Sequence, residues 1–338
     1  MADAEVRYRF LSVLGEGGFG KVYRARMEAA EGFHKDVAIK VLHDPNPPRS
    51  LLQRHRDEAK ILGLIRDRAI VGVEPPIRVG NQWAVVMEFV DGVSCGALIS
   101  AGPVPPGVAV EIVGEVARAL HNVYQMEGPE GQPLHLLHRD IKPDNVQVTP
   151  AGEIRLLDFG IARANFAARE FKTRHSIGGT PGYIAPERLH AIETPAGDVF
   201  SLGVLLHEIV TGDRPKYAPT VHLDGNGLPV VDTAEIAEGP IPPDRAEVLK
   251  LSAWMRADEP EERPSARDVE RECRRLRNQL DGAYLRDWAE EHVPHRNDLA
   301  PDEMIGRVIT ATSGQLTLTP IDGAERLAPP TVPPVNAG

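Results

Sequence analysis

A glycine-rich segment near the start of the chain has the composition of a phosphate-binding loop. It reads Gly15-Glu16-Gly17-Gly18-Phe19-Gly20. Because glycine has no side chain, backbone N–H groups can approach phosphate oxygens closely in such a segment. Taken alone, the segment is as typical of a tight turn between two strands as of a phosphate loop.

The residues after these glycines exclude two familiar phosphate loops. The P-loop of nucleoside triphosphatases needs serine or threonine after Gly-Lys, but Val22 follows Gly20-Lys21. A dinucleotide-binding fold needs a helix directly after the glycines, whereas residues 22–26 alternate like a strand. A glycine-rich hairpin between two strands remains, with Val22 placed to cover a flat base.

One lysine stands at the end of the apolar sequence Val37-Ala38-Ile39-Lys40. A lysine in apolar surroundings is costly unless it meets an anion. Nucleotide phosphates would supply one anion, and Glu58 on the helix expected next in the chain could supply another. A lysine at the solvated edge of a sheet is the alternative interpretation.

Three motifs follow in order: His138-Arg139-Asp140-Ile141-Lys142-Pro143-Asp144-Asn145, then Asp158-Phe159-Gly160, then Ala185-Pro186-Glu187. Each is short, but their order and spacing after the glycine-rich hairpin and Lys40 make chance agreement negligible. In these residues the chain resembles the eukaryotic-type serine/threonine protein kinases of bacteria, over roughly residues 8–280. The resemblance implies an α+β, bilobal protein-kinase fold. Its N-lobe would be small, antiparallel and β-rich with one helix, and its larger C-lobe mainly α-helical.

The resemblance also implies the reaction, which is transfer of the γ-phosphoryl group of Mg-ATP to serine and threonine hydroxyls of proteins. Mn²⁺ is an alternative metal. By resemblance, Asp140 orients the acceptor hydroxyl and Lys142 stabilises the migrating phosphoryl group. Asn145 and Asp158 would hold magnesium, a hard cation that prefers oxygen ligands.

A nucleotide site between the lobes is implied in the same way. Lys40 would hold the phosphates and Glu58 would fix Lys40, while Met87 would be the gatekeeper residue beside adenine. The nucleotide-contacting residues implied by the resemblance are Leu14, Gly15, Glu16, Gly17, Gly18, Phe19, Gly20, Val22, Ala38, Lys40, Met87, Glu88, Val90 and Gln147.

Gln147 departs from the family pattern, which usually has an apolar residue beneath adenine. It lies between Val146 and Val148. Its methylene groups could still cover the ring, and its amide end is then expected to be solvated.

The resemblance further implies residues that support the site. Asp198 would brace residues 138–145, called the catalytic loop below, and Arg263 would pair with Glu187. An apolar column linking the lobes would consist of Leu62, Val73, His138 and Phe159.

Two local features favour serine or threonine over tyrosine as the acceptor. Lys142 follows the catalytic base by two residues, and Gly179-Thr180-Pro181 precedes the Ala-Pro-Glu motif. Both are typical of serine/threonine enzymes, and Thr180 could bridge Asp140 and Lys142.

The basic segment 161–179 is expected to be a phosphorylation switch. Arg139 needs an anionic partner, which a phosphate on this segment could provide. Thr173 and Ser176 are the candidate sites, and the sequence does not choose between them. Self-association for autophosphorylation in trans is a further expectation.

Hydrophobic periodicity predicts the elements that position these residues. Strands are expected at residues 8–14, 21–26, 36–42 and 83–90, with a helix at 51–65. Further helices are expected at 108–124, 199–211 and 269–280. The N-lobe would be 8–90 and the C-lobe 91–280. Residues 281–338 would form a C-terminal extension, a short helix at 283–292 and then a proline-rich linker or tail.

Composition limits the classes of function. The 338 residues include 38 basic and 49 acidic side chains, a net charge of -11, which argues against a dedicated nucleic-acid binder. Two cysteines, no apparent signal peptide and no run of eighteen apolar residues predict a cytoplasmic protein without a membrane span in this chain. Membrane tethering is expected only if the natural chain continues beyond residue 338.

Two other classes of function share parts of this pattern. A pseudokinase, an ATP-binding scaffold without transfer, usually lacks Lys40, Asp140 or Asp158, and this chain has all three. A small-molecule kinase is disfavoured by the Ala-Pro-Glu motif and the threonine-containing loop before it, which serve peptide docking.

Overall fold

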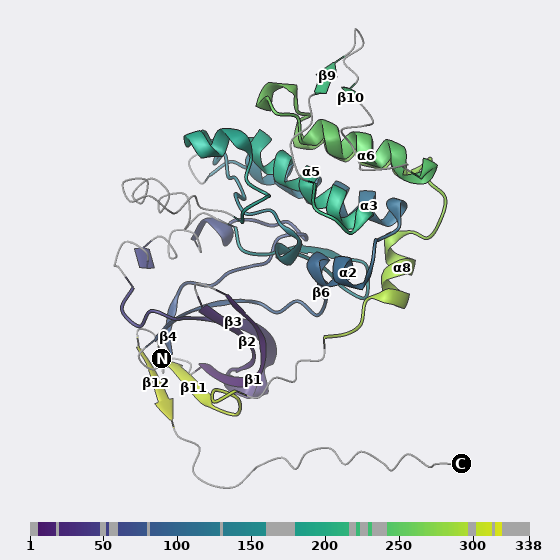
Figure 1. The fold of residues 1–338 in the computed structure, drawn as a ribbon. Coiled ribbons are helices and arrows are strands. Elements are labelled where there is room, and N and C mark those ends of the chain that lie inside the picture. The colour runs from purple at the N-terminus through teal and green to yellow at the C-terminus, as the bar shows by residue number, and fades with distance from the viewer. Residues whose placement is uncertain are drawn as a thin grey trace, which may run out of the picture.

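The computed structural model describes residues 6–17, 20–47, 52–53, 60–79, 82–128, 131–159, 180–215, 221–223, 229–231, 242–296, 302–312 and 315–319. The described chain forms a β-rich N-lobe and a mainly helical C-lobe (Figure 1). This arrangement confirms the fold class expected from the sequence.

The N-lobe is an antiparallel sheet whose central strands are those predicted. They are β1 (Val6–Gly17), β2 (Gly20–Glu28), β3 (His34–Leu42) and β5 (Gln82–Glu88), with the short β4 (Ile77–Val79) at one edge. A short 3-10 turn, η1 (Ala30–Gly32), precedes β3. Alternate side chains of the strands point into one core, as the period-two pattern requires. Phe10, Tyr23 and Ile39 are buried there.

The predicted helix at 51–65 is only partly visible in the described residues. Residues 52–53 and 60–62 are helical, and a turn follows at residues 63–64. The N–H groups of Leu64 and Ile65 donate to the carbonyls of Ile61 and Leu62, at 3.0 and 3.1 Å. These i to i−3 bonds tighten the chain at Gly63 and end the helix, so the predicted end at Ile65 is wrong by three residues. Glu58 lies outside the described residues.

The C-lobe is built around α3 (Pro106–Tyr124), a helix buried along most of its length. Also present are α2 (Cys95–Ala101), α5 (Pro195–Thr211), α6 (Pro243–Met255) and α7 (Ala266–Arg277). The helices α3, α5 and α7 confirm predictions, whereas α2 and α6 were not predicted. Helix α7 ends three residues before the predicted Leu280, where Asn278 caps it.

Short elements carry the motifs singled out in the sequence and lie among these helices. They are β6 (Val93–Ser94), β7 (Val146–Val148), β8 (Ile154–Leu156), η2 (Pro143–Asn145), η4 (Pro186–His190) and η6 (Pro260–Glu262); β9 (Val221–Leu223) and β10 (Pro229–Val231) pair separately. The strand order β6-β7-β8 places Asn145 immediately before β7 and Asp158 just after β8. The hairpin therefore brings the two predicted metal ligands to one end of the small sheet.

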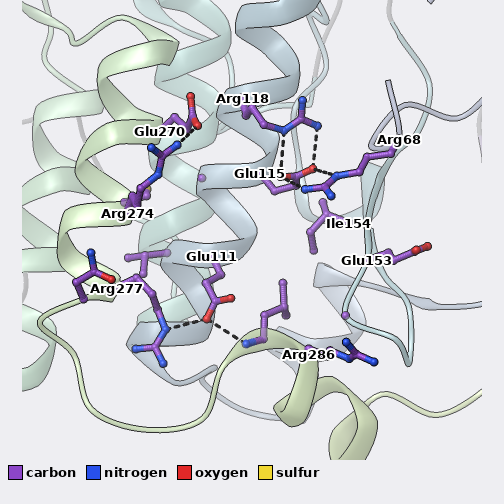
Figure 2. Close-up of a pocket in the computed structure, with 16 residues that line it drawn as sticks. Arg68, Glu111, Glu115, Arg118, Glu153, Ile154, Glu270, Arg274, Arg277 and Arg286 are labelled. Atoms are coloured by element: carbon purple, nitrogen blue, oxygen red, sulfur yellow. Dashed lines mark hydrogen bonds and ion pairs between the residues drawn. The ribbon is translucent and has the colours of Figure 1, made fainter. Parts of the chain in front are cut away.

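The C-terminal extension begins with α8 (Leu285–His292), in the region where a short helix was predicted. Its attachment to the C-lobe depends on Glu111 of α3. That carboxylate accepts from Arg277 Nε at 2.8 Å and from the Leu285 N–H at 3.0 Å (Figure 2). Figure 2 shows these contacts in a pocket where several arginines are matched by carboxylates, as in the Arg274–Glu270 and Arg68–Glu115 pairs. The contacts of Glu111 in this pocket thus connect α3 with α7 and with the start of α8.

Two strands of the extension belong to the N-lobe sheet, which the sequence analysis did not predict. They are β11 (Val308–Thr312) and β12 (Gln315–Thr319), and β11 pairs antiparallel with β1. The sheet order is β12-β11-β1-β2-β3-β5-β4. The sheet is curled so that β12 lies beside β4 (Figure 1). The N-lobe sheet is therefore completed by residues more than 200 positions beyond its central strands.

Within the described ranges, none of the helices combines the length and apolar character needed to cross a bilayer.

Candidate active site

The glycine-rich hairpin lies beside the lysine-bearing strand in the same sheet, because its second strand, β2, pairs with β3. In the sheet register Gly17 is opposite Gly20, Val22 is opposite Lys40, and Ala38 is opposite Met87. A Cβ on Gly20 would lie 2.3 Å from the carbonyl oxygen of Val41, so glycine is required for this close approach. Gly18 and Phe19, at the tip, lie outside the described residues.

Lys40 meets the acidic residue of the Asp-Phe-Gly motif. Its Nζ donates to Asp158 Oδ2 at 2.8 Å, across 118 positions of sequence. Asp158 has a φ of 50°, an unfavourable conformation for a non-glycine residue and one often found at functional sites. The predicted Lys40–Glu58 contact remains a prediction, because Glu58 is not described.

The catalytic loop places three predicted residues together. Asp140 is 5% exposed, and its Oδ2 accepts from Asn145 Nδ2 at 2.9 Å. Lys142 Nζ lies 3.5 Å from the same oxygen and donates to Thr180 Oγ1 at 3.1 Å. Of the expected bridge by Thr180 between Asp140 and Lys142, the contact with Lys142 is present, and Lys142 itself lies between Thr180 and Asp140.

Asp198, at the start of α5, supports the catalytic loop as expected. Its carboxylate accepts from the N–H groups of His138 and Arg139, at 2.7 and 2.8 Å. These bonds stabilise Arg139 at a φ of 68°. Burial lowers the pKa of His138, which fits a neutral ring whose Nε2 donates to the Leu157 carbonyl at 2.9 Å.

Arg139 already has an anionic partner in the described structure. Its Nε donates to the carboxylate of Glu193, and Arg188 Nη1 donates to the Arg139 carbonyl at 2.6 Å. Glu193 thus supplies an anion that the sequence did not predict, and a contact of Arg139 with a phosphate on segment 161–179 stays a prediction. Thr173 and Ser176 lie outside the described residues, so phosphorylation there stays a prediction.

The other supporting residues predicted from the resemblance also meet. Arg263 makes two bonds to Glu187, at 2.7 and 2.9 Å, with both side chains buried. The ring centroids of His138 and Phe159 are 4.6 Å apart. Leu62 and Phe159 belong to one buried cluster, and Val73 packs against it.

We define the hinge as Met87, Glu88 and Val90, the nucleotide-contacting residues predicted at the end of β5 and just beyond it. Met87 pairs with Val73 through an isolated bridge, and the Glu88 N–H donates to the Gly72 carbonyl at 3.0 Å. The Glu88 side chain is held by Arg155 of β8. Val90, the last of the three, is 8% exposed. The hinge is thus attached through its backbone to the loop before β4, and through the Glu88 side chain to the small sheet β6-β7-β8.

Gln147 differs from its expected state. It lies on β7 and is only 7% exposed, and its Oε1 atom is buried without a hydrogen-bond partner in the described part of the chain. The expectation of a fully solvated amide is wrong, because the neighbouring strands enclose the carbonyl end. An unsatisfied buried acceptor costs about 1–3 kcal/mol.

We expect Gln147→Leu to stabilise the fold, by up to about 2 kcal/mol, and to preserve or tighten ATP binding. The substitution removes the unpaired acceptor and keeps an apolar surface of similar size. Urea unfolding and calorimetric titration with Mg-ATP measure the two effects, and Gln147→Met is the control for side-chain length. A loss of ATP affinity above about tenfold, 1.4 kcal/mol, would show that the amide bonds the nucleotide.

The side chains present suit a nucleoside triphosphate with a divalent cation. Lys40 and Lys142 are cations on either side of the Asp140–Asn145–Asp158 cluster. Asn145 uses Nδ2 to donate to Asp140, so its Oδ1 is the atom left for a metal ion, together with the Asp158 carboxylate. This oxygen donor set is the kind that hard cations prefer.

The family model described as protein kinase domain matches residues 8–272. With this fold and this cluster of residues, the chain belongs to the protein kinase family. Members of the family use ATP with a divalent metal ion. Their phosphoryl acceptors are proteins.

The chain is also similar to two curated protein kinases and to one kinase domain of known structure. Serine/threonine-protein kinase PknB of Mycobacterium leprae is 33% identical over 244 residues, 70% of this chain and 36% of PknB. Tyrosine-protein kinase MasK of Myxococcus xanthus is 33% identical over 217 residues, 62% of this chain and 33% of MasK. This chain thus spans about a third of the length of these relatives. The crystal structure of the PknI kinase domain of Mycobacterium tuberculosis matches with a TM-score of 0.55 at 24% identity, covering 80% of this chain and 96% of that one, which supports the fold.

Sequence reasoning missed two groups of residues around the site. Glu193 and Arg188 lie just beyond the Ala-Pro-Glu motif, and no motif marks their contact with Arg139. The strands β11 and β12 had a signal, because residues 308–312 are rich in β-branched side chains and Ser313-Gly314 is a turn sequence.

Proposed function

We propose that this chain is an active serine/threonine protein kinase that transfers the γ-phosphoryl group of Mg-ATP to protein hydroxyls. The observation that carries the proposal is the arrangement around Asp140. Its buried carboxylate is held by Asn145 and lies next to Lys142, which bonds Thr180. A base, a cation and the segment before the Ala-Pro-Glu motif therefore meet at one point.

Each residue has a role that follows from its position. Asp140 accepts the proton of the acceptor hydroxyl and orients the oxygen for in-line attack. Lys142 offers a cation 3.5 Å from Asp140, where negative charge accumulates on the transferred group. Lys40 positions the phosphates, and Asp158 and Asn145 would hold Mg²⁺. Magnesium, when bound, neutralises phosphate charge.

The choice of serine or threonine rests on Lys142 and Thr180. The bond between them keeps Lys142 beside Asp140, the arrangement expected of serine/threonine enzymes. The relatives include one named a serine/threonine-protein kinase and one named a tyrosine-protein kinase. The following experiment therefore tests which hydroxyl this chain phosphorylates.

Incubation with γ-labelled ATP and peptides identical except for a central Ser, Thr or Tyr tests the proposal. We expect label on Ser and Thr peptides, with rates at least tenfold above the Tyr peptide. Mg²⁺ should support transfer, with Mn²⁺ as the alternative and EDTA as the blank. ATP binding without transfer would instead favour a pseudokinase scaffold, and label only on tyrosine would refute the acceptor assignment.

Three further parts of the function are proposals. The kinase domain would comprise an N-lobe at 8–90 and a C-lobe at 91–280, with residues 281–338 as the extension. Self-association would permit autophosphorylation at Thr173 or Ser176. The catalytic domain would act in the cytoplasm, tethered to the membrane only if the natural chain continues. Phosphosite mapping after ATP incubation tests the second of these directly.

A further inference from the structure

The C-terminal extension passes from the C-lobe to the glycine-rich hairpin. We define the C-terminal strap as its described part after Pro294, namely His295, Arg296 and residues 302–312. One end of the extension is attached to the C-lobe at Glu111 of α3, which accepts from Arg277 Nε of α7 at 2.8 Å and from the Leu285 N–H at the start of α8 at 3.0 Å (Figure 2). Arg277 also donates to the carbonyls of Leu280 and Gly282, at 2.7 and 3.0 Å. The other end is β11, beside β1 of the N-lobe (Figure 1).

The first contact of the strap is at the hinge. The Arg296 N–H donates to Asp91 Oδ1 at 2.9 Å, and His295 Nδ1 lies 2.7 Å from Asp91 Oδ2. Asp91 follows Val90, the last predicted hinge residue. Burial opposes ionisation of Asp91, but these two hydrogen bonds keep its pKa below the ordinary value. The strap therefore holds the chain immediately beyond the adenine-binding segment.

The second contact is at the start of the glycine-rich hairpin. The pairing of β1 with β2 shifts register between Val13 and Gly15, so Leu14 is the extra residue of a β-bulge. A bulge leaves a backbone group outside the ladder. The Arg296 guanidinium donates to the Leu14 carbonyl. One strap residue thus contacts both Asp91, just beyond the hinge, and Leu14, at the start of the glycine-rich hairpin.

The third contact is on the second strand of the hairpin. Lys21 Nζ lies 2.8 Å from Asp302 Oδ2, and the Asp302 side chain is only 14% exposed. The hydrogen bond between them raises the pKa of Lys21 and lowers that of Asp302. Burial and then the charge of Asp302 raise the pKa of Tyr23 to about 12. Lys21 directly follows Gly20, so this ion pair fixes the strand that ends the glycine loop.

Backbone pairing continues the attachment along β1. The Phe10 N–H donates to the Arg307 carbonyl at 3.0 Å, and the Gly306 N–H donates to the Phe10 carbonyl at 2.9 Å. Beyond it, Ile309 is fully buried in the N-lobe core. The attachment of the strap to the sheet is therefore part of the N-lobe fold. Arg296 additionally contacts Asp91 and Leu14, and Asp302 contacts Lys21 and also accepts from the Met304 N–H of the strap at 2.8 Å.

We propose that Arg296 and Asp302 are positioning residues that hold the glycine-rich hairpin over the nucleotide site, so that the C-terminal strap sets nucleotide affinity. The inference rests on the proposed function for the identity of the nucleotide. A free hairpin must lose conformational freedom each time a nucleotide binds, and a hairpin held in advance has already lost it. The strap should therefore lower the Kd and KM for ATP and leave kcat nearly unchanged.

The test compares charge reversals at two adjacent acidic residues in the full chain. Asp302→Lys removes the ion pair and places two cations together, while Glu303→Lys makes the same charge change at an exposed position. Relative to Glu303→Lys, we expect Asp302→Lys to raise the KM and calorimetric Kd for Mg-ATP at least threefold, with kcat within twofold. The double variant Lys21→Glu/Asp302→Lys should return the Kd to within twofold of the parent.

Two further variants keep the test decisive. Arg296→Gln should raise the Kd for Mg-ATP at least twofold, because it releases the Leu14 carbonyl. Asp302→Asn should also raise this Kd at least twofold, and it replaces Asp302→Lys in the test if Asp302→Lys does not fold. A purely structural role would lower the melting temperature without separating KM from kcat or allowing rescue by the charge swap. Equal Kd values for the Asp302, Arg296 and Glu303 variants, or failure of the swap to rescue, would overturn the proposal. If the parent binds ATP but transfers nothing, the calorimetric comparison still decides the strap, and only the proposed function fails.

Discussion

Asp140→Ala should lower the rate of phosphoryl transfer by about 10²–10⁴-fold and leave the Kd for Mg-ATP within about twofold of the parent. Asp140 lies on the acceptor side of the cluster, bonded to Asn145 and adjacent to Lys142. Removing its carboxylate removes the group that orients the acceptor hydroxyl. The measurements are single-turnover transfer to a peptide and calorimetric titration with Mg-ATP.

A second variant separates the two sides of the site. Asp158→Ala should reduce transfer and also weaken magnesium-dependent ATP binding, because Asp158 bonds Lys40 and is the predicted metal ligand. Asp244→Ala, which removes an exposed carboxylate in the first turn of α6, should change neither quantity. If Asp140→Ala retains most of its transfer rate, the catalytic assignment is wrong.

Arg263→Met should destabilise the fold by about 3–5 kcal/mol, since it leaves the carboxylate of Glu187 buried and unpaired. The Arg263 side chain is fully buried and that of Glu187 is 6% exposed. Arg263 also donates to the carbonyls of Ala257, Asp258 and Ala196, at 2.7, 2.9 and 3.1 Å. One side chain thus joins η4, which follows the Ala-Pro-Glu alanine, to α5 and the loop after α6. Urea unfolding measures the loss.

Two comparisons identify the cause of that loss. Arg271→Met removes an arginine of α7 that is 68% exposed, and should change stability by less than about 0.5 kcal/mol. The double variant Glu187→Leu/Arg263→Met removes both buried charges, and we expect it to recover part of the loss. A stability for Arg263→Met equal to that of Arg271→Met would contradict the buried-pair argument.

Local sequence was sufficient to predict the residues of the proposed site. Asp140, Asn145 and Asp158 stand in short motifs because phosphoryl transfer needs particular side chains at fixed spacing on adjoining turns and strands. The strands β1, β2, β3 and β5 and the helices α3, α5 and α7 were likewise predictable, because their apolar residues either recur with a strand or helix period or, in the deeply buried α5, form a long apolar run.

Contacts between distant segments were decided by the tertiary structure. The pairing of Arg139 with Glu193 and the burial of Gln147 depend on which surfaces meet when the lobes fold. The same holds for the contacts of Arg296 and Asp302 with the glycine-rich hairpin, about 280 positions away in sequence. Sequence periodicity indicates which residues of a helix or strand are buried, but it does not indicate which other element that helix or strand packs against or pairs with. For that reason β11 was recognisable only as a strand-forming stretch, and its place beside β1 follows from the fold alone.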